Sequence, residues 1–449
     1  MGPDPLSFDG GRTSAYERAA AFGLSHVLFA KSPDGVAAAA GRTAAFRPLV
    51  DDAVAGSGID ADLVEAIVFL ESAGRPDVIA GRDPEHAAGL TQILAETATN
   101  FLGMRVDLAA SRPLTRRIED ARRRGDRQAV ERLQAERRLV DARFDPPQAL
   151  AGTVRYLTEA RRWFGRDDLA VVSYHMGIGN LEGVLRAYSG RPSGPIETVV
   201  DDEDLDFARV YFDSSPIRHR EAWERLASFG DDSQTYYWRV LAAGEIMRLF
   251  RENPAELDGL ARLHGRGPSA EQVLQPPEVT QRFAEPDDLE AALKGGALQT
   301  LPNDPARLHF RVDPRVGRMA ARIGGDPAAY RTLRRRALAL LRYLAAQVHD
   351  LSAAERPLIV TSAAYDEASG PTLLLQSEPE TATHSSLHAT GYAFDIRRRY
   401  ESGAQAMAFQ WALERLEALG LTAWTRRRAV IHITVSPLAD VRAVPSDRS

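Results

Sequence analysis

A glutamate at the end of an apolar helical stripe, within residues 61–92, constrains this chain more than any other feature. Val64, Ile67 and Val68 lie seven, four and three positions before Glu71. In a helix, this spacing places the three apolar side chains on the same face as Glu71. Most glutamates near helix ends are solvated. The alternative is a carboxyl in an apolar cleft, whose raised pKa keeps it protonated near neutrality and suited to general acid catalysis.

The residues that follow favour the second interpretation. Gly74 and Pro76 end the predicted helix, and a loop then leads to Ala87-Ala88-Gly89-Leu90-Thr91-Gln92. Two small residues and a glycine allow the backbone to approach another segment or a ligand closely. We therefore expect Glu71 to face a site rather than bulk solvent.

Three motifs in this region resemble those of the lytic transglycosylases with a goose-lysozyme-like fold. Glu71-Ser72 matches the family's Glu-Ser pair, and Gly89-Leu90-Thr91-Gln92 matches Gly-Leu-Met-Gln with threonine replacing methionine. Ser173-Tyr174-His175-Met176-Gly177 matches Ala-Tyr-Asn-x-Gly, with serine and histidine replacing alanine and asparagine. The resemblance covers about residues 58–188 and implies a mainly α-helical, lysozyme-like domain.

The resemblance also implies a reaction and a set of site residues. The family cleaves peptidoglycan glycan strands between N-acetylmuramic acid and N-acetylglucosamine and leaves 1,6-anhydro ends, with no cofactor. Glu71 would be the catalytic acid and base. Substrate contacts would come from the remaining motif residues, with Ser72 supporting the Glu71 loop: Ser72, Gly89, Leu90, Gln92, Tyr174 and His175.

Length and composition limit the other classes of function. A chain of 449 residues predicts two or three domains, and 44% hydrophobic with 26% charged residues is typical of a soluble globular protein. The net charge of −6 argues against nucleic acid as a partner. The absence of cysteine excludes disulfides, thiolate catalysis and cysteine zinc sites. No apolar run is long enough to predict a transmembrane segment.

The expected location follows from the substrate that the resemblance implies. The first residues, MGPDPLSFDGG, lack the basic and apolar regions of a signal peptide. We expect an extracytoplasmic protein, periplasmic or secreted, whose export signal is absent from this sequence.

The pattern along the chain predicts a multidomain protein. Residues 1–50 form an N-terminal helical extension, and 51–252 form the transglycosylase domain, with a charged helical hairpin inserted at 111–143. The hairpin is interpreted mainly as a solvated face with exposed ion pairs; a glycan- or teichoic-acid-binding arm is the alternative. Residues 253–306 are predicted to be a linker with one short helix near 287–293.

Residues 307–449 are predicted to form a small α+β domain. Helices are expected at 326–350 and 407–419, and strands at 358–362 and 430–435. The aromatic run Tyr236-Tyr237-Trp238, which precedes the linker, is interpreted as buried core, with a wall of the substrate groove as the alternative.

A second motif lies in this C-terminal domain. The run from Ser386 to Asp395 matches Ser-x-His-x-x-Gly-x-Ala-x-Asp and resembles the zinc D-alanyl-D-alanine peptidases, which share a fold with hedgehog domains. His432 lies where that family has its third ligand. The resemblance implies a zinc site made by His388, Asp395 and His432, since two imidazoles and a carboxylate leave a fourth position for water.

Two departures from the peptidase pattern predict weak or absent peptide hydrolysis. Ala429 stands where the family has a catalytic glutamate, and Asp366 replaces its substrate-binding arginine. His384 and Glu380 are candidate substitutes for the missing base. We expect the domain to bind stem peptides through a groove that the metal organises.

Three hypotheses follow for the whole chain. The first is a peptidoglycan lytic transglycosylase whose partners are glycan strands and stem peptides. The second adds an active zinc peptidase. The third, a non-catalytic wall-binding protein, ranks last because such a protein has no need of an acid on an apolar stripe.

Overall fold

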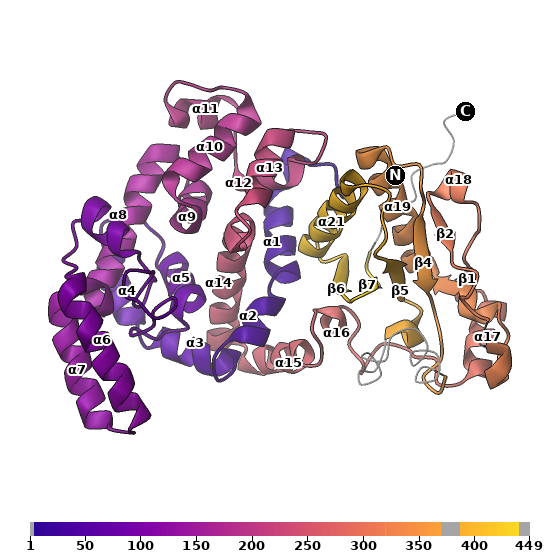
Figure 1. Cartoon of the computed structure of the whole chain (residues 1–449), viewed down its shortest axis with the longest axis horizontal. Helices are drawn as coiled ribbons and strands as arrows, with labels where there is room; N and C mark the ends of the chain where they lie inside the picture. Colours follow the sequence, from indigo (N-terminus) through magenta and orange to yellow (C-terminus); the bar gives the residue numbers. More distant parts are fainter. Residues whose placement is uncertain (1–3, 319, 370–386, 440–449) are drawn as a thin grey trace. The chain divides into compact units, whose positions relative to one another are not determined.

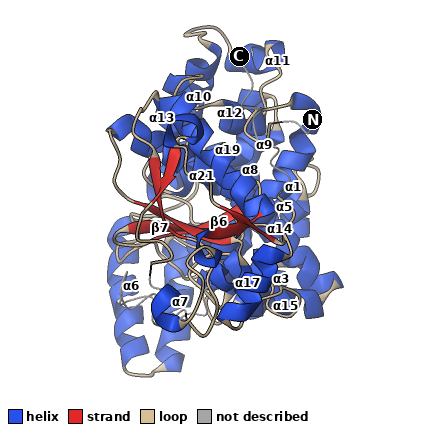
Figure 2. Cartoon of the chain, turned by 90° about the vertical axis from the view of Figure 1, so that its right-hand side faces the viewer, coloured by secondary structure: helices blue, strands red, loops and turns tan. Residues whose placement is uncertain are grey.

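The computed structural model describes residues 4–318, 320–369 and 387–439 (Figure 1). These residues are mainly helical with a small proportion of β-structure (Figure 2), which fits a helical domain and a small α+β domain. Two compact units alternate along the sequence. The helical unit comprises Val27–Val210 and Arg225–Ala261, and the sheet unit comprises Met1–His26, Tyr211–Glu224 and Arg262–Ser449.

The helical unit contains short and medium helices joined by tight turns. None of the described helices is both long enough and apolar enough to cross a membrane. The helices of this unit are α2 (His26–Lys31), α3 (Val36–Ala44), α4 (Arg47–Val54), α5 (Ala61–Ser72), α6 (Leu108–Arg123), α7 (Arg127–Val140), α8 (Pro146–Phe164), α9 (Asp167–Met176), α10 (Ile178–Ser189), α11 (Ile196–Asp202), α12 (Phe207–Asp213), α13 (Arg220–Ser228), α14 (Tyr236–Glu252) and α15 (Pro254–His264). Four of them, α2, α12, α13 and α15, run across a boundary between the units.

Helix α5 carries Glu71 and is buried in the centre of this unit. The Asp60 carboxylate caps its first turn, and Ala73 ends it in the left-handed conformation. Val64, Ile67 and Val68 are fully buried, which confirms the predicted apolar face. Helix α14 packs along α5, where an ion pair joins the buried Glu65 to Arg251.

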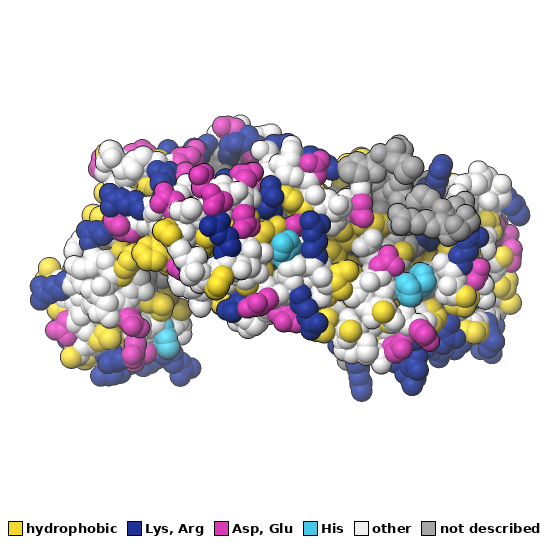
Figure 3. Space-filling model, turned by 90° about the horizontal axis from the view of Figure 1, so that it is seen from above, with side chains coloured by type: hydrophobic (Ala, Val, Ile, Leu, Met, Phe, Trp, Pro, Cys, Tyr) yellow, Lys and Arg dark blue, Asp and Glu magenta, His cyan; other side chains and the backbone are white. Residues whose placement is uncertain are grey.

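Helices α6 and α7 form the predicted charged hairpin, with Gly125 in the turn between them. Exposed ion pairs such as Arg117 with Glu136 link the two helices. Over the chain as a whole, acidic and basic side chains are interspersed on much of the face that Figure 3 shows. The hairpin is nevertheless not solvated on all sides. It has a small apolar core of its own, made by Ile118, Ala121, Ala129 and Leu133.

A five-stranded sheet is the centre of the sheet unit. Its strands follow the order β2 (Phe310–Val312), β4 (Leu358–Ser362), β5 (Ala393–Arg397), β7 (Val430–Val435) and β6 (Thr422–Arg426). Only the β2–β4 pair is parallel. Two long helices, α19 (Arg335–Ser352) and α21 (Gly403–Ala418), share an apolar core with the sheet.

Alternation along the strands divides the sheet residues between two faces. In β5 and β7, Phe394, Ile396, Ile431 and Ile433 join the core shared with α19 and α21. The intervening residues Asp395 and His432 therefore lie on the opposite face, where the strand register pairs them directly.

Segments far apart in sequence complete the sheet unit. Helix α1 (Thr13–Gly23) packs against α21 so closely that a Cβ atom at Gly23 would lie 2.1 Å from the carbonyl oxygen of Glu417. The buried Arg415 of α21 donates to the carbonyl of Tyr211 and stacks on that ring. Trp411 donates to the carbonyl of Ser214.

The structure differs from the sequence expectation in two places. Residues 253–306, expected to be a linker, contain α15, α16 (Glu271–Leu274), α17 (Pro286–Lys294) and β1 (Leu298–Thr300), and only α17 was anticipated. The helix expected from residue 326 begins at Arg335, because β3 (Thr332–Arg334) is extended and pairs with β1. A short helix, α18 (Pro305–Leu308), precedes β2.

Candidate functional site

Glu71 lies at the last turn of α5 and is only partly exposed. Burial raises the pKa of its carboxyl from 4.5 to about 7, and the hydrogen bond from Tyr236 opposes this rise. The Tyr236 hydroxyl donates to Oε1 of Glu71 over 2.7 Å. Within the described residues, Oε2 of Glu71 has no hydrogen-bond partner. The group can therefore hold or release a proton near neutral pH.

Tyr236 comes from the first turn of α14, 165 residues after Glu71. Burial, and next the nearby Glu71 carboxyl, hold its pKa well above 10, so the phenol keeps its proton and donates it. Its ring stacks on His175 with 4.9 Å between centroids. The His175 ring is held in turn by Ser233, whose Oγ lies 3.1 Å from Nδ1. Sequence reasoning missed this role of Tyr236, because the aromatic run indicated core packing.

Tyr174 is the second tyrosine near Glu71. Its hydroxyl donates to the carbonyl of Thr91 over 2.8 Å and lies 3.2 Å from the hydroxyl of Thr153. Burial raises the Tyr174 pKa, and the Glu71 carboxyl raises it further. Tyr156 packs edge-to-face against the ring. The structure thus brings the first and third predicted motifs together, and Tyr174 also binds the second motif through Thr91.

The second motif forms a tight turn that only glycine can begin. Gly89 has φ of +83°, and a Cβ atom there would lie 1.8 Å from the carbonyl oxygen of Arg143. Gln92 also has positive φ, and its Nε2 donates to the carbonyls of Val78 and Gly89. Leu90 is fully buried, so its side chain does not reach a ligand.

Ser72 has a local role in the structure. Its buried hydroxyl donates to the carbonyl of Val68 within α5, at 3.2 Å. This bond lies within the last turn of the helix that carries Glu71. No contact of Ser72 with a ligand follows from it.

A buried ion pair holds the turn that begins at Gly89. Arg143 and Asp141 are both inaccessible to solvent and are 2.8 Å apart. The Arg143 guanidinium also donates to the carbonyls of Pro84, His86 and Ile93, which flank the turn. Sequence reasoning did not single out this pair, since Asp141 and Arg143 resemble the many other charges of the hairpin.

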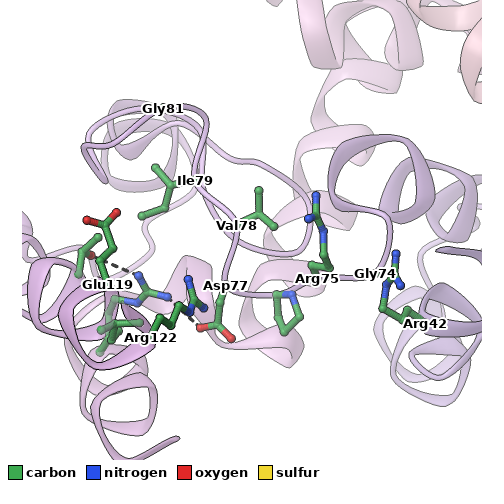
Figure 4. A pocket seen from close by; sticks show the side chains of 13 residues that line it. Arg42, Gly74, Arg75, Asp77, Val78, Ile79, Gly81, Glu119 and Arg122 are labelled. Carbon is green, nitrogen blue, oxygen red and sulfur yellow. Dashed lines mark hydrogen bonds and ion pairs between the residues drawn. The ribbon is translucent and has the colours of Figure 1, made fainter. Parts of the chain in front are cut away.

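A pocket of about 540 Å³ lies between the loop that follows α5 and the hairpin α6–α7 (Figure 4). Glu71 does not line it. Its charged lining residues are mainly basic: Arg42, Arg75, Arg122 and Arg137, with Asp77 and Glu119. Arg137 is buried and pairs with Asp77 at 2.8 Å, so this pair forms part of the pocket wall.

The sheet unit brings the three predicted metal ligands together. His388, Asp395 and His432 are buried, and one ligand atom from each lies within 4.8 Å of the others. Oδ1 of Asp395 lies 3.3 Å from Nε2 of His388 and 2.8 Å from Nδ1 of His432. Two imidazoles and a carboxylate are the donor types that zinc takes, so the group fits a metal ion. Ser386, His384 and Glu380 lie outside the described residues.

Burial and mutual hydrogen bonds set the charge of this group. Burial lowers the pKa of His388. Burial also lowers the pKa of His432, but hydrogen bonds to Asp395 and Glu271 outweigh it and raise that pKa to about 9. Burial raises the pKa of Asp395, and the two imidazoles more than offset this, which holds the Asp395 pKa well below its usual range.

Glu271 is the residue of this site that sequence reasoning missed. It lies on α16, within the segment expected to be a linker, and its Oε2 is 3.2 Å from Nε2 of His432. No motif marks it, because it reaches the site only through the packing of α16 on the sheet.

Asp366, which stands where the resembled peptidase family has its substrate-binding arginine, has a structural role in this chain. Asp366 is fully buried and accepts hydrogen bonds from the Tyr330 hydroxyl and from the backbone N–H of Ser369. Ala429, where the family has its catalytic glutamate, is exposed. The chain matches no protein-family model, and no significantly similar curated protein was found.

Proposed function

We propose that this protein is a peptidoglycan lytic transglycosylase with Glu71 as its catalytic acid and base. The observation that carries the proposal is the environment of Glu71: a partly exposed carboxyl on an apolar stripe, with a pKa of about 7 and a tyrosine donor on one oxygen only. Structural glutamates on a surface have no reason to be held in this state. The proposed substrate places the protein outside the cytoplasm.

The chemistry needs one group that both gives and takes a proton. Protonated Glu71 donates its proton to the glycosidic oxygen as the bond to the anomeric carbon of N-acetylmuramic acid breaks. The resulting carboxylate takes the proton of the 6-hydroxyl of that sugar, whose oxygen attacks the anomeric carbon. The product is a 1,6-anhydro end, Glu71 is protonated again, and no water is consumed.

Nearby residues would orient this carboxyl and the sugar. The Tyr236 hydroxyl holds Oε1 of Glu71 and leaves Oε2 for the substrate. Tyr174 lies near this carboxyl and binds the turn from Gly89 to Gln92 through Thr91. Tyr174, the turn and the exposed His175 would position the sugar. Leu90 would contribute through its backbone, because its side chain is buried.

The sheet unit is proposed to bind zinc through His388, Asp395 and His432 and to hold stem peptides. A bound zinc would supply a Lewis-acidic centre with an open fourth position. Asp366 and Ala429 supply neither a substrate arginine nor a base, which favours binding over efficient peptide hydrolysis. The three converging ligands are the observation that keeps a bifunctional enzyme with an active zinc peptidase as the second candidate.

Digestion of purified peptidoglycan sacculi by the wild-type chain and by Glu71→Gln tests the proposal. Mass spectrometry separates the candidates, because anhydro ends indicate a transglycosylase, cut stems indicate a peptidase, and neither indicates a binding protein. We expect mostly anhydro ends from the wild type. General acid–base catalysis contributes about 10² to 10⁴-fold, so the variant should lose at least about 10²-fold in rate.

The matched control is Glu131→Gln on the exposed face of α7, which should cleave as the wild type does. A Glu71→Gln variant that keeps more than about a tenth of wild-type activity, a barrier change below about 1.4 kcal/mol, shows that Glu71 is not the acid. A majority of free reducing ends would instead assign a hydrolase of the lysozyme type.

A further inference from the structure

His432 is held between two carboxylates. Its Nδ1 lies 2.8 Å from Oδ1 of Asp395, and its Nε2 lies 3.2 Å from Oε2 of Glu271. The Thr434 hydroxyl, two residues along β7, donates to the same Glu271 oxygen at 3.3 Å. Glu271 is buried. Both nitrogens of the His432 imidazole thus have a partner: Nδ1 faces the proposed metal ligand Asp395, and Nε2 faces Glu271.

The fold holds Glu271 firmly in this place. Helix α16 contacts β6 and β7, and Ala270 and Leu274, on either side of Glu271, pack on Ala423 of β6. Gln275 donates to the carbonyl of Val435 over 2.7 Å at the end of β7. Ala423 pairs with Thr434 in the sheet register. The helix therefore covers the same sheet face that carries His432.

We propose that Glu271 is a positioning residue for the metal ligand His432. By accepting a hydrogen bond from Nε2–H, it would keep Nε2 as the protonated nitrogen when a metal is bound, so that Nδ1 is the nitrogen that gives up its proton and serves as the ligand atom beside Asp395 and His388. The inference rests on the proposed metal site. It assigns a role to a part of the chain that lies outside both sequence motifs.

His388 is held in the complementary way. Its Nδ1 lies 2.7 Å from the carbonyl oxygen of Ala363, so the N–H is on that side and Nε2 faces Asp395. A metal-binding histidine usually donates its second N–H to a carboxylate or carbonyl, which orients the ring and makes the ligand nitrogen more basic. The two histidines thus each have such an acceptor, a neutral carbonyl for His388 and a carboxylate for His432.

A purely structural role for Glu271 makes a different prediction. Glu271 would then attach α16 to the sheet, and its loss would destabilise the metal-free protein without affecting the intrinsic metal affinity. The positioning role predicts the reverse: a small effect on the metal-free protein and a large effect on binding. Metal affinity and metal-free stability, measured on the same variants, separate the two roles.

The experiment compares the full-length chain with Glu271→Gln and Glu271→Ala. Zinc affinity is measured by competition with a chromophoric chelator, the Co²⁺ absorption spectrum reports ligand geometry, and thermal unfolding in chelator reports the metal-free state. The control is Glu278→Gln, an exposed residue of the same segment that pairs with Arg266. Loss of such an outer partner costs about 10 to 100-fold in affinity.

We expect Glu271→Ala to lose about 10 to 100-fold in zinc affinity and to change the Co²⁺ spectrum. Glu271→Gln, whose amide oxygen still accepts the Nε2–H bond, should lose less, and Glu278→Gln should match the wild type. Equal zinc affinity in all four proteins, or a loss explained by lower metal-free stability, overturns the inference. A wild-type chain that binds no zinc overturns the metal proposal and this inference with it.

Discussion

A carboxyl whose pKa rises on folding makes the folded protein less stable at higher pH, because the unfolded chain loses its proton first. Burial raises the Glu71 pKa from 4.5 to about 7. Between these two values the folded state binds more protons than the unfolded state, so stability falls as pH rises. Above about pH 7 both states are ionised and the loss is complete.

Glu71→Gln should therefore be more stable than the wild type at pH 8, and the difference should shrink as pH falls toward 4.5. The pKa shift corresponds to a difference of about 1 to 3 kcal/mol in the free energy of unfolding at pH 8. This range allows for the solvent that reaches part of the carboxyl and weakens the effect of burial. Chemical denaturation at a series of pH values measures the difference, with Glu131→Gln as the surface control. A difference that does not depend on pH would contradict the raised pKa.

The rate of glycan cleavage should depend on the protonation of the same carboxyl. The acid must be protonated before the first step, so the rate at saturating substrate should fall as pH rises through about 7. A pH series of glycan cleavage by the wild-type chain measures this decline. A rate that stays constant from pH 6 to pH 9 would show that a group other than Glu71 donates the proton.

At the scale of single residues, the sequence could identify Glu71 but not its partner. The spacing of Val64, Ile67 and Val68 is local and marks the apolar face directly. Tyr236 is 165 residues away, and only the packing of α14 on α5 brings its hydroxyl to Glu71. Glu271 was missed for the same reason, since no local pattern relates α16 to His432.

At the scale of elements, the turn that begins at Gly89 offers a test of how tightly the candidate site is built. Gly89→Ala places a Cβ atom on the Arg143 carbonyl and also needs a left-handed alanine, which alone costs about 1 to 3 kcal/mol. We expect Gly89→Ala to lower the unfolding midpoint and to reduce cleavage strongly. Thermal unfolding and sacculus digestion measure these two effects.

Gly125→Ala is the matched control for that substitution. Gly125 has φ of +73°, but nothing lies within 4 Å of an added Cβ atom. The control thus carries the backbone strain without the clash. If the two variants lose the same stability, the close contact between Gly89 and Arg143 is not an essential part of the fold.

The strands and helices of the sheet unit were predictable to different degrees. Strands β4 and β7 have the predicted bounds, because runs of β-branched residues indicate buried strands. Residues 253–306 contain many prolines and glycines, a composition that predicts a linker, yet α16 is buried there. Tertiary packing, rather than helix propensity, determines that this four-residue helix forms.

At the scale of the whole molecule, removal of the proposed zinc should lower the free energy of unfolding. Zinc at a free concentration of 100 times its Kd would stabilise the folded state by about 2.7 kcal/mol, equivalent to roughly 5 to 10 °C in Tm. A chelator should therefore lower the unfolding midpoint of the wild type. His388→Ala, which lacks one ligand, should show no response. No detectable metal together with an unchanged midpoint in chelator would exclude the zinc site.

The interleaved order of the two units has a consequence for how this chain can be cut and synthesised. A fragment that begins at residue 307 keeps all three metal ligands but lacks α1, α16 and the residues that bind Trp411 and Arg415. During translation the helical unit is complete long before the last strands of the sheet unit emerge. The part of helix α1 that packs on α21 therefore has no partner until α21 leaves the ribosome.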